Sequence, residues 1–111
     1  MKEEKITVHQ GPIITLTYRV CEERRQDLIL FLQSAITIYE ELGGIKVGLY
    51  ESSDEPGLFC EYVFYDSVQS YVADQVRVEE DPRMKAVLAQ WHTFIDGPLE
   101  VRRLMPVTLT A

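Results

Sequence analysis

The stretch LFCEYVFY, residues Leu58–Tyr65, decides the fold, because its residue types favour a β-strand and both of its faces are largely apolar. Successive side chains of a strand point to opposite faces of a sheet. One face therefore carries Leu58, Cys60, Tyr62 and Phe64, and the other carries Phe59, Glu61, Val63 and Tyr65. Both faces need cover from water. We expect helices of the same chain to cover one face, and a second copy of the chain to cover the other.

Hydrophobic periodicity places six further elements around this strand. Alternation predicts strands at 13–20, 45–51 and 99–105, and three- and four-residue spacing predicts helices at 22–42 and 68–78. Asp81-Pro82 predicts the start of a third helix, which Gly97-Pro98 would end. Asp66 or Ser67 is expected to cap the helix at 68–78.

This order predicts an α+β domain of ferredoxin-like topology, β-α-β-β-α-α-β, over residues 13–106. It has a four-stranded antiparallel sheet with helices on one face, because right-handed crossovers place both connections on the same side. Pairing of two sheets would complete a homodimeric α/β barrel. Residues 1–12 are expected to be a flexible arm, and residues 107–111 a tail.

Glu61 interrupts the second face of the central strand, which we expect to face the partner subunit. A buried carboxylate needs a compensating partner. Arg19 lies on the more polar face of the neighbouring first strand, so we predict an Arg19–Glu61 pair on the dimer-facing side. The alternative is that Glu61 reaches solvent at the rim of the barrel.

Composition disfavours two kinds of partner, although a local basic patch could still exist. The 111 residues carry 18 acidic and 11 basic side chains, a formal charge of −7, which disfavours nucleic acid and anionic membranes. No apolar run approaches the length of a membrane span, and no secretory signal follows the charged start, so we expect a cytoplasmic protein. Cys21 and Cys60 are then expected to be reduced core residues.

The candidate chemistry rests on histidine and aromatic side chains. His92 could act as a general base, with Tyr62 as a second proton-handling group, or it could be a helix-surface histidine without a chemical role. Tyr18, Tyr71 and Trp91 could line a ligand cavity under the helices, or could simply pack the core. His9 is expected to be solvated, and no metal site is predicted.

The element order over residues 13–106, with the segments LGGIKVGLYE (Leu42–Glu51) and EYVFYDS (Glu61–Ser67), resembles the dimeric α/β-barrel superfamily. That superfamily includes antibiotic-biosynthesis-type monooxygenases and stress-responsive barrel proteins. Its haem-degrading members use an Asn, a Trp and a His around the haem. This sequence has no Asn, and adjacent Trp91 and His92 point about 100° apart on a helix.

Two functions from different classes are compatible with these features. The first is a cofactor-independent enzyme, monooxygenase-like or isomerase-like, that acts on a small aromatic molecule between helices and sheet. The second is a non-catalytic dimeric module that binds a ligand or serves in a stress response. An enclosed cavity with His92 at its wall would favour the enzyme, and a filled core with His92 in solvent would favour the module.

Overall fold

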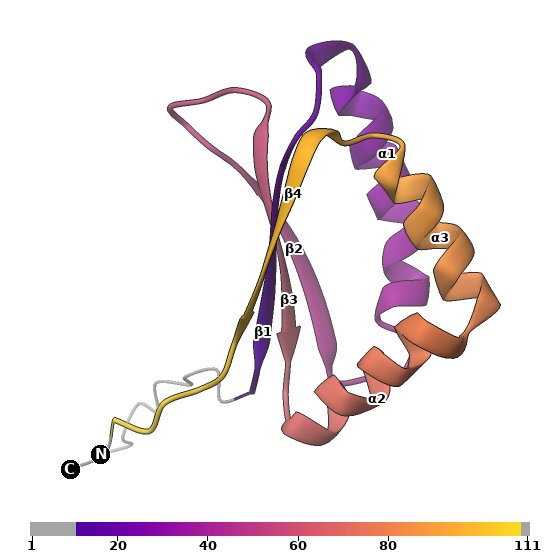
Figure 1. Ribbon diagram of the computed structural model, residues 1–111, viewed down its shortest axis with the longest axis vertical. Helices are drawn as coiled ribbons and strands as arrows, with labels where there is room; N and C mark the ends of the chain where they lie inside the picture. The colour runs from indigo at the N-terminus through magenta and orange to yellow at the C-terminus, as the bar shows by residue number, and fades with distance from the viewer. Residues whose placement is uncertain (1–10, 110–111) are drawn as a thin grey trace, which may run out of the picture.

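The computed structural model describes residues 11–109. The elements follow the expected order and are β1 (Ile13–Arg19), α1 (Glu22–Tyr39), β2 (Ile45–Glu51), β3 (Leu58–Tyr65), α2 (Val68–Glu80), α3 (Pro82–His92) and β4 (Asp96–Leu104). The four strands form one antiparallel sheet in the order β2-β3-β1-β4, which is the ferredoxin-like arrangement. All three helices lie on one side of the sheet (Figure 1).

Local sequence signals account for most helix boundaries. The Ser67 side chain accepts a hydrogen bond from the Ser70 backbone N–H, and the Asp81 side chain accepts one from the Arg83 N–H. Both expected caps are therefore confirmed. Helix α1 ends at Tyr39, three residues earlier than expected, and the chain reaches β2 through Gly43 and Gly44. Gly44 has φ 71°, and a Cβ there would collide with the Asp66 carboxyl group.

The start of β4 differs from the expectation. Gly97 and Pro98 belong to the strand, whereas α3 ends at His92. The pairing of β1 with β4 shifts between Thr17 and Arg19, opposite Gly97, whose φ is 86°. A register shift at a positive-φ glycine bends an edge strand without ending it. Gly97 therefore marks a bulge in β4 and not the end of α3.

The assignment of the two faces of β3 was wrong. Leu16 of β1 stands opposite Glu61, and Tyr18 stands opposite Phe59, so Phe59, Glu61, Val63 and Tyr65 all face the helices. The helix-free face of β3 carries Leu58, Cys60, Tyr62 and Phe64. Because both faces are apolar, alternation alone could not tell which one the helices cover.

The expected apolar face of α2 is also wrong. Val68, Val72 and Val76 are exposed, whereas Asp74 and Arg77 are the buried residues of this helix. The main core joins Tyr18 and Phe59 of the sheet to Leu28 of α1 and to Met84 and Trp91 of α3. Helix α2 thus presents charged side chains to the interior, which requires that their charges be compensated.

The ends and the cysteines complete the comparison with expectation. Residues 1–10 of the expected arm, including His9, lie outside the described residues, but Gly11 and Pro12 are buried and the Pro12 carbonyl accepts a hydrogen bond from the Tyr65 N–H. Both cysteines are free; Cys21 is exposed and is not a core residue. None of the described helices combines the length and the apolarity that a membrane crossing needs.

Candidate functional site

A cavity of about 220 Å³ lies between the helix-covered face of the sheet and helices α2 and α3. Its walls are mostly aliphatic, and include Leu16, Val47, Val63, Met84, Leu88 and Val101. The polar groups in the wall come from nine residues: Glu61 and Tyr65 of β3, Tyr39 of α1, Asp74, Gln75 and Arg77 of α2, Trp91 and His92 of α3, and Arg103 of β4. An apolar cavity with a few polar groups is the usual form of a site for a small organic ligand.

Glu61 is the most unusual residue in this wall, because its carboxyl group is almost fully shielded from water inside an aliphatic cavity. Its relative exposure is 3%. Its Oε1 accepts a hydrogen bond from the Tyr18 hydroxyl at 2.7 Å. Burial raises the pKa of Glu61, while the Tyr18 hydroxyl and the Trp91 indole act in the opposite direction. Such a carboxyl group keeps its proton to higher pH than an exposed glutamate and can exchange that proton with a molecule bound in the cavity.

Three aromatic side chains surround the Glu61 carboxyl. The Tyr18 and Trp91 rings meet edge to face, with centroids 5.3 Å apart. Burial, followed by the negative charge of Glu61, raises the pKa values of both Tyr18 and Tyr39, so both hydroxyl groups stay protonated as donors. These residues come from β1, α1 and α3, and the fold therefore assembles them from distant parts of the chain.

Some polar atoms in the wall have no hydrogen-bond partner. Among the described residues, the buried side-chain nitrogen and oxygen atoms without one are the Tyr39 hydroxyl, Arg77 Nε and Trp91 Nε1. All three residues line the cavity. The Trp91 N–H influences the Glu61 pKa but does not reach hydrogen-bond geometry with it. Buried polar groups are nearly always paired in proteins, so this cluster requires an explanation.

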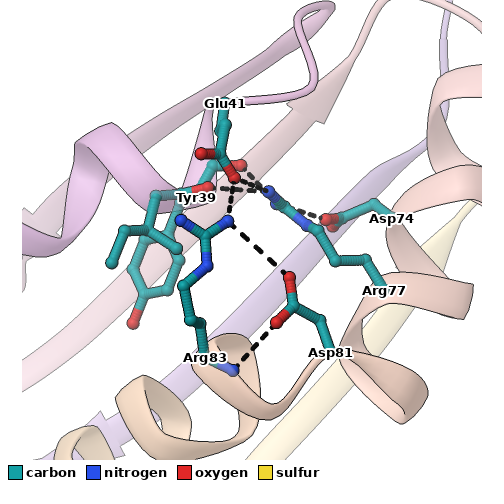
Figure 2. A network of polar contacts seen from close by, with 7 residues as sticks. Tyr39, Glu41, Asp74, Arg77, Asp81 and Arg83 are labelled. Atoms are coloured by element: carbon teal, nitrogen blue, oxygen red, sulfur yellow. Dashed lines mark hydrogen bonds and ion pairs between the residues drawn. The ribbon is translucent and has the colours of Figure 1, made fainter.

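Arg77 fixes the opposite wall of the cavity by joining α2 to the end of α1 (Figure 2). Its Nη1 donates to the Ile38 carbonyl, and its Nη2 donates to the Tyr39 carbonyl and to Asp74, each at 2.7 Å. Asp74 also accepts a hydrogen bond from the Tyr65 hydroxyl, whose pKa is raised mainly by burial. The guanidinium thereby adds hydrogen bonds to two carbonyl groups in the last turn of α1, one of which, that of Ile38, also accepts from the Glu41 N–H.

An outer ring of charges continues this network to the surface. Glu41 lies between Arg77 and Arg83, and Arg83 also lies near Asp81, the cap of α3 (Figure 2). The side chain of Arg83 is 59% exposed, whereas that of Arg77 is 7% exposed. Only the inner part of the network is therefore shielded strongly enough for charge pairing to matter to stability.

The structure brings some of the candidate residues to the cavity. Trp91 and His92 both line it, and their rings meet edge to face with centroids 5.0 Å apart. The His92 side chain is exposed, which places it at the rim of the cavity. Tyr18 contributes through its hydrogen bond to Glu61.

Tyr62 and Tyr71 lie elsewhere. Tyr62 is on the helix-free face of the sheet, beside Tyr50 and Phe64, and the sheet separates it from His92. Tyr71 packs edge to face on Tyr65, in a small cluster with Ile14 and Ile45. The expected pairing of His92 with Tyr62 in one site is therefore not what the structure shows.

The predicted Arg19–Glu61 pair is wrong. Arg19 points to the helix-free face and pairs with Glu55 of the β2–β3 loop at 2.6 Å, where both side chains are more than half exposed. Glu61 points to the opposite face and bonds Tyr18. Successive side chains of β1 point to opposite faces, so Tyr18, the residue before Arg19, is the one that can reach Glu61.

The sequence reasoning missed Tyr39, Asp74 and Arg77 as parts of the site. Asp74 and Arg77 stand three residues apart on α2, the spacing of neighbouring side chains on one helix face. That spacing was a usable signal, but the valines at 68, 72 and 76 led to the prediction that the opposite face of α2 is buried. Glu61 was singled out, although on the wrong face of the sheet.

Comparisons with known proteins support the fold. The sequence matches no protein-family model and no curated protein. Among solved structures, the monooxygenase from the gene ActVA-Orf6 of Streptomyces coelicolor, in complex with the ligand Nanaomycin D, is similar, with 17% identity, 93% of each chain covered and a TM-score of 0.70. A NIPSNAP family protein from Agrobacterium tumefaciens is 18% identical, with 99% of this chain and 97% of that chain covered and a TM-score of 0.70.

A third solved structure, Rv0793 from Mycobacterium tuberculosis, is 21% identical, with 91% of this chain and all of that chain covered and a TM-score of 0.65. At these identities the likeness concerns the fold alone. The resemblance of the sequence to ferredoxin-like proteins of the antibiotic-biosynthesis-monooxygenase type is thereby confirmed for the fold of the chain.

Proposed function

We propose that this protein is a cofactor-independent enzyme, monooxygenase-like or isomerase-like, that acts on a small aromatic molecule in the cavity between the sheet and helices α2 and α3. One observation carries the proposal: the Glu61 carboxyl, with its raised pKa, lies in the wall of an otherwise aliphatic cavity. Burying a carboxyl group costs stability. Such costs concentrate where a protein uses the group for chemistry.

The chemistry begins with the transfer of a proton from the hydroxyl group of a bound phenol to the Glu61 carboxylate. The products are a phenolate and the neutral carboxylic acid. Donors beside Glu61, the Trp91 N–H and the Tyr39 hydroxyl, would stabilise the new negative charge. His92, at the rim, is the second candidate for moving a proton between the cavity and water.

The two reaction types differ in the fate of the phenolate. In the monooxygenase-like reaction, the phenolate carbon reacts with O₂; one oxygen atom enters the ring as a carbonyl, the other leaves as water, and a phenol is oxidised to a quinone. In the isomerase-like reaction, Glu61 returns the proton to a ring carbon of the phenolate, which gives the keto tautomer, and O₂ takes no part. The named activity and ligand of the Streptomyces protein with this fold favour the first.

The experiment is to incubate the protein with phenols and naphthols and to follow O₂ uptake with an electrode and quinone formation by absorbance. Uptake of one O₂ per quinone, lost in Glu61→Gln, is the expected result. Product formation without O₂ uptake would select the isomerase-like reaction. Saturable binding without any product would overturn the enzymatic proposal and support the alternative, a non-catalytic ligand-binding module.

We also propose that the protein is a homodimer whose subunits meet through the helix-free face of the sheet. This face carries Tyr50, which is 61% exposed, and its neighbours Tyr62 and Phe64. Contiguous apolar side chains on an open sheet need cover, and no helix of the described chain lies on this side. A second copy supplies an identical apolar face, which suits a symmetric interface.

A further inference from the structure

Two rows of apolar side chains are exposed on the described chain, outside both the cavity and the helix-free face of the sheet. The first row is on α2, where three valines repeat every four residues and are each about half exposed: Val68, Val72 and Val76. The second row lies in the segment after β4, residues 105–109, which we call the terminal segment. Its large apolar side chains alternate along the chain and are more than half exposed: Met105, Val107 and Leu109. Contiguous exposed apolar side chains of this kind mark surfaces that another molecule covers.

The spacing of the two rows matches. Residues four apart on a helix are about 6 Å apart along its axis, and residues two apart on an extended chain are about 6.6 Å apart. Three side chains of the terminal segment can therefore lie against the three valines at once. Pro106 has no N–H group for a strand ladder, so the terminal segment is better suited to contacts through side chains than to further pairing of strands.

One charge at the end of each row gives the contact a direction. Glu79 follows Val72 by seven residues, close to two full turns of a helix, and is exposed on the valine side of α2. Arg103 precedes Met105 by two residues, and its exposed side chain continues the alternation of the terminal segment. No ion pair joins Glu79 or Arg103 to another of the described residues. The two opposite charges meet when the terminal segment runs antiparallel to α2.

The terminal segment does not cover the valine row of its own chain. The buried Asp74 follows Val72 by two residues, about 200° around the helix, so the valines face away from the sheet. The terminal segment instead continues β4 past the end of the sheet and away from the helices (Figure 1). Each copy of the chain thus presents one uncovered row of each kind, and a second copy carries the complementary row for both.

We propose that the terminal segment of one copy docks on the valine row of α2 in a second copy. The antiparallel alignment pairs four positions between the two copies: Arg103 with Glu79, Met105 with Val76, Val107 with Val72, and Leu109 with Val68. The contact joins two different surfaces and uses neither face of the sheet. It therefore goes beyond the proposed dimer, and it does not rest on the proposed activity.

This contact is weak by itself. An interface of a few side chains from each copy is much smaller than the roughly 1,200 Å² that a stable specific interface buries. Two such contacts between two sheet-to-sheet dimers reinforce each other, because the second one forms within a single complex. We therefore expect transient association of dimers at high protein concentration, which a covalent bond can trap.

The test is disulfide trapping between two single-cysteine variants of a chain in which serine replaces both Cys21 and Cys60. Val107→Cys, with an affinity tag that marks its mass, is mixed at high micromolar concentration with untagged Val72→Cys under mild oxidation. The control partner is Leu30→Cys on α1, because Leu30 is 54% exposed and Val72 is 53% exposed. We expect trapping with Val72→Cys to be roughly tenfold faster, since docking raises the local concentration of the two thiols. Equal rates, or faster trapping with Leu30→Cys, would overturn the inference.

Charge reversal tests the direction of docking. Glu79→Lys in the Val72→Cys chain, or Arg103→Glu in the Val107→Cys chain, should slow trapping by about threefold, the effect of one exposed ion pair. Mixing the two reversed chains should restore the rate, because the pair is then re-formed with opposite signs. Glu23→Lys in the Val72→Cys chain, an exposed position in the first turn of α1, is the matched control and should leave the rate unchanged. A doubly reversed pair that stays slow would contradict the proposed alignment.

A chain that carries both Val72→Cys and Val107→Cys distinguishes docking between copies from docking within one chain. We expect disulfide-linked species of two or more chains, whose yield rises with protein concentration. A disulfide within one chain, formed at a rate independent of concentration, would refute the proposal. If the serine-substituted chain does not fold, as judged by circular dichroism, the same variants are made with the native cysteines, and peptide mapping identifies which cysteines are joined.

Discussion

Replacing Arg77 with methionine should destabilise the protein more than any other single change of a charged side chain to an apolar one in the network of Figure 2. Methionine fills similar space but leaves the Asp74 carboxylate buried, with the Tyr65 hydroxyl as its remaining side-chain partner. It also leaves the Ile38 and Tyr39 carbonyls without the guanidinium. Removing one partner of a buried ion pair typically costs about 3–5 kcal/mol.

That loss is large relative to the whole stability of a domain of this size, about 5–15 kcal/mol. At about 4 °C or more per kcal/mol, the melting temperature should fall by at least roughly 12 °C. The assay is urea unfolding followed by Trp91 fluorescence, in which the midpoint falls and the slope stays constant.

Two further variants decide whether the reasoning is right. Arg83→Met, which removes an exposed partner of Glu41, should cost about 0–1 kcal/mol. The double variant Asp74→Leu with Arg77→Met removes both charges and should recover part of the loss, because no unpaired charge remains. A cost below about 1 kcal/mol for Arg77→Met, or a double variant less stable than Arg77→Met alone, would refute the account of the network.

Other predictions concern Glu61 and the helix-free face. Because burial raises the pKa of Glu61, the folded state binds the proton more tightly than the unfolded state, so wild-type stability should fall as pH rises from about 4.5 through the raised pKa. Glu61→Gln should remove that fall and should be more stable than the wild type at pH 8. Melting temperatures of the two proteins that change in the same way between pH 4.5 and 8 would contradict this. Tyr18→Phe removes a hydrogen bond that lowers the pKa of Glu61, so the acid limb of any pH–rate profile should move to higher pH. The stability loss should be about 1–2 kcal/mol. An acid limb that does not move would show that Tyr18 does not influence the titration of Glu61. Tyr62→Glu places a charge on the helix-free face and should convert the proposed dimer to a folded monomer in light scattering, whereas an unchanged mass would place the interface elsewhere.

The sequence was sufficient for the order of elements, because each strand and helix has its own periodicity and its own start or stop signal. Ser67 and Asp81 cap the helices that they were expected to cap. The sequence was insufficient to decide which face of β3 the helices cover. Both faces of this strand are largely apolar, so the choice of the dimer-facing side was arbitrary. The false Arg19–Glu61 pair resulted directly from that choice.

The candidate site was only partly accessible to sequence reasoning for a related reason. Hydrophobic patterning assumes that charges face water, but Asp74 and Arg77 are buried and paired, while Val72 on the same helix is exposed. Long-range partners decide such cases: the buried Arg77 donates to carbonyl groups 38 and 39 residues earlier in the chain. Periodicity within one helix carries no information about them.

The most direct measurement is a carbon-13 NMR titration of the glutamate side-chain carboxyls, with the Glu61 signal assigned by its absence in Glu61→Gln. An acid enclosed by hydrocarbon and held by Tyr18 should titrate clearly above the ordinary glutamate value of about 4.3, and a phenol probe in the cavity should displace that midpoint. If the signal titrates at or below the ordinary value and ignores the probe, then Glu61 is not the proton acceptor of a ligand cavity.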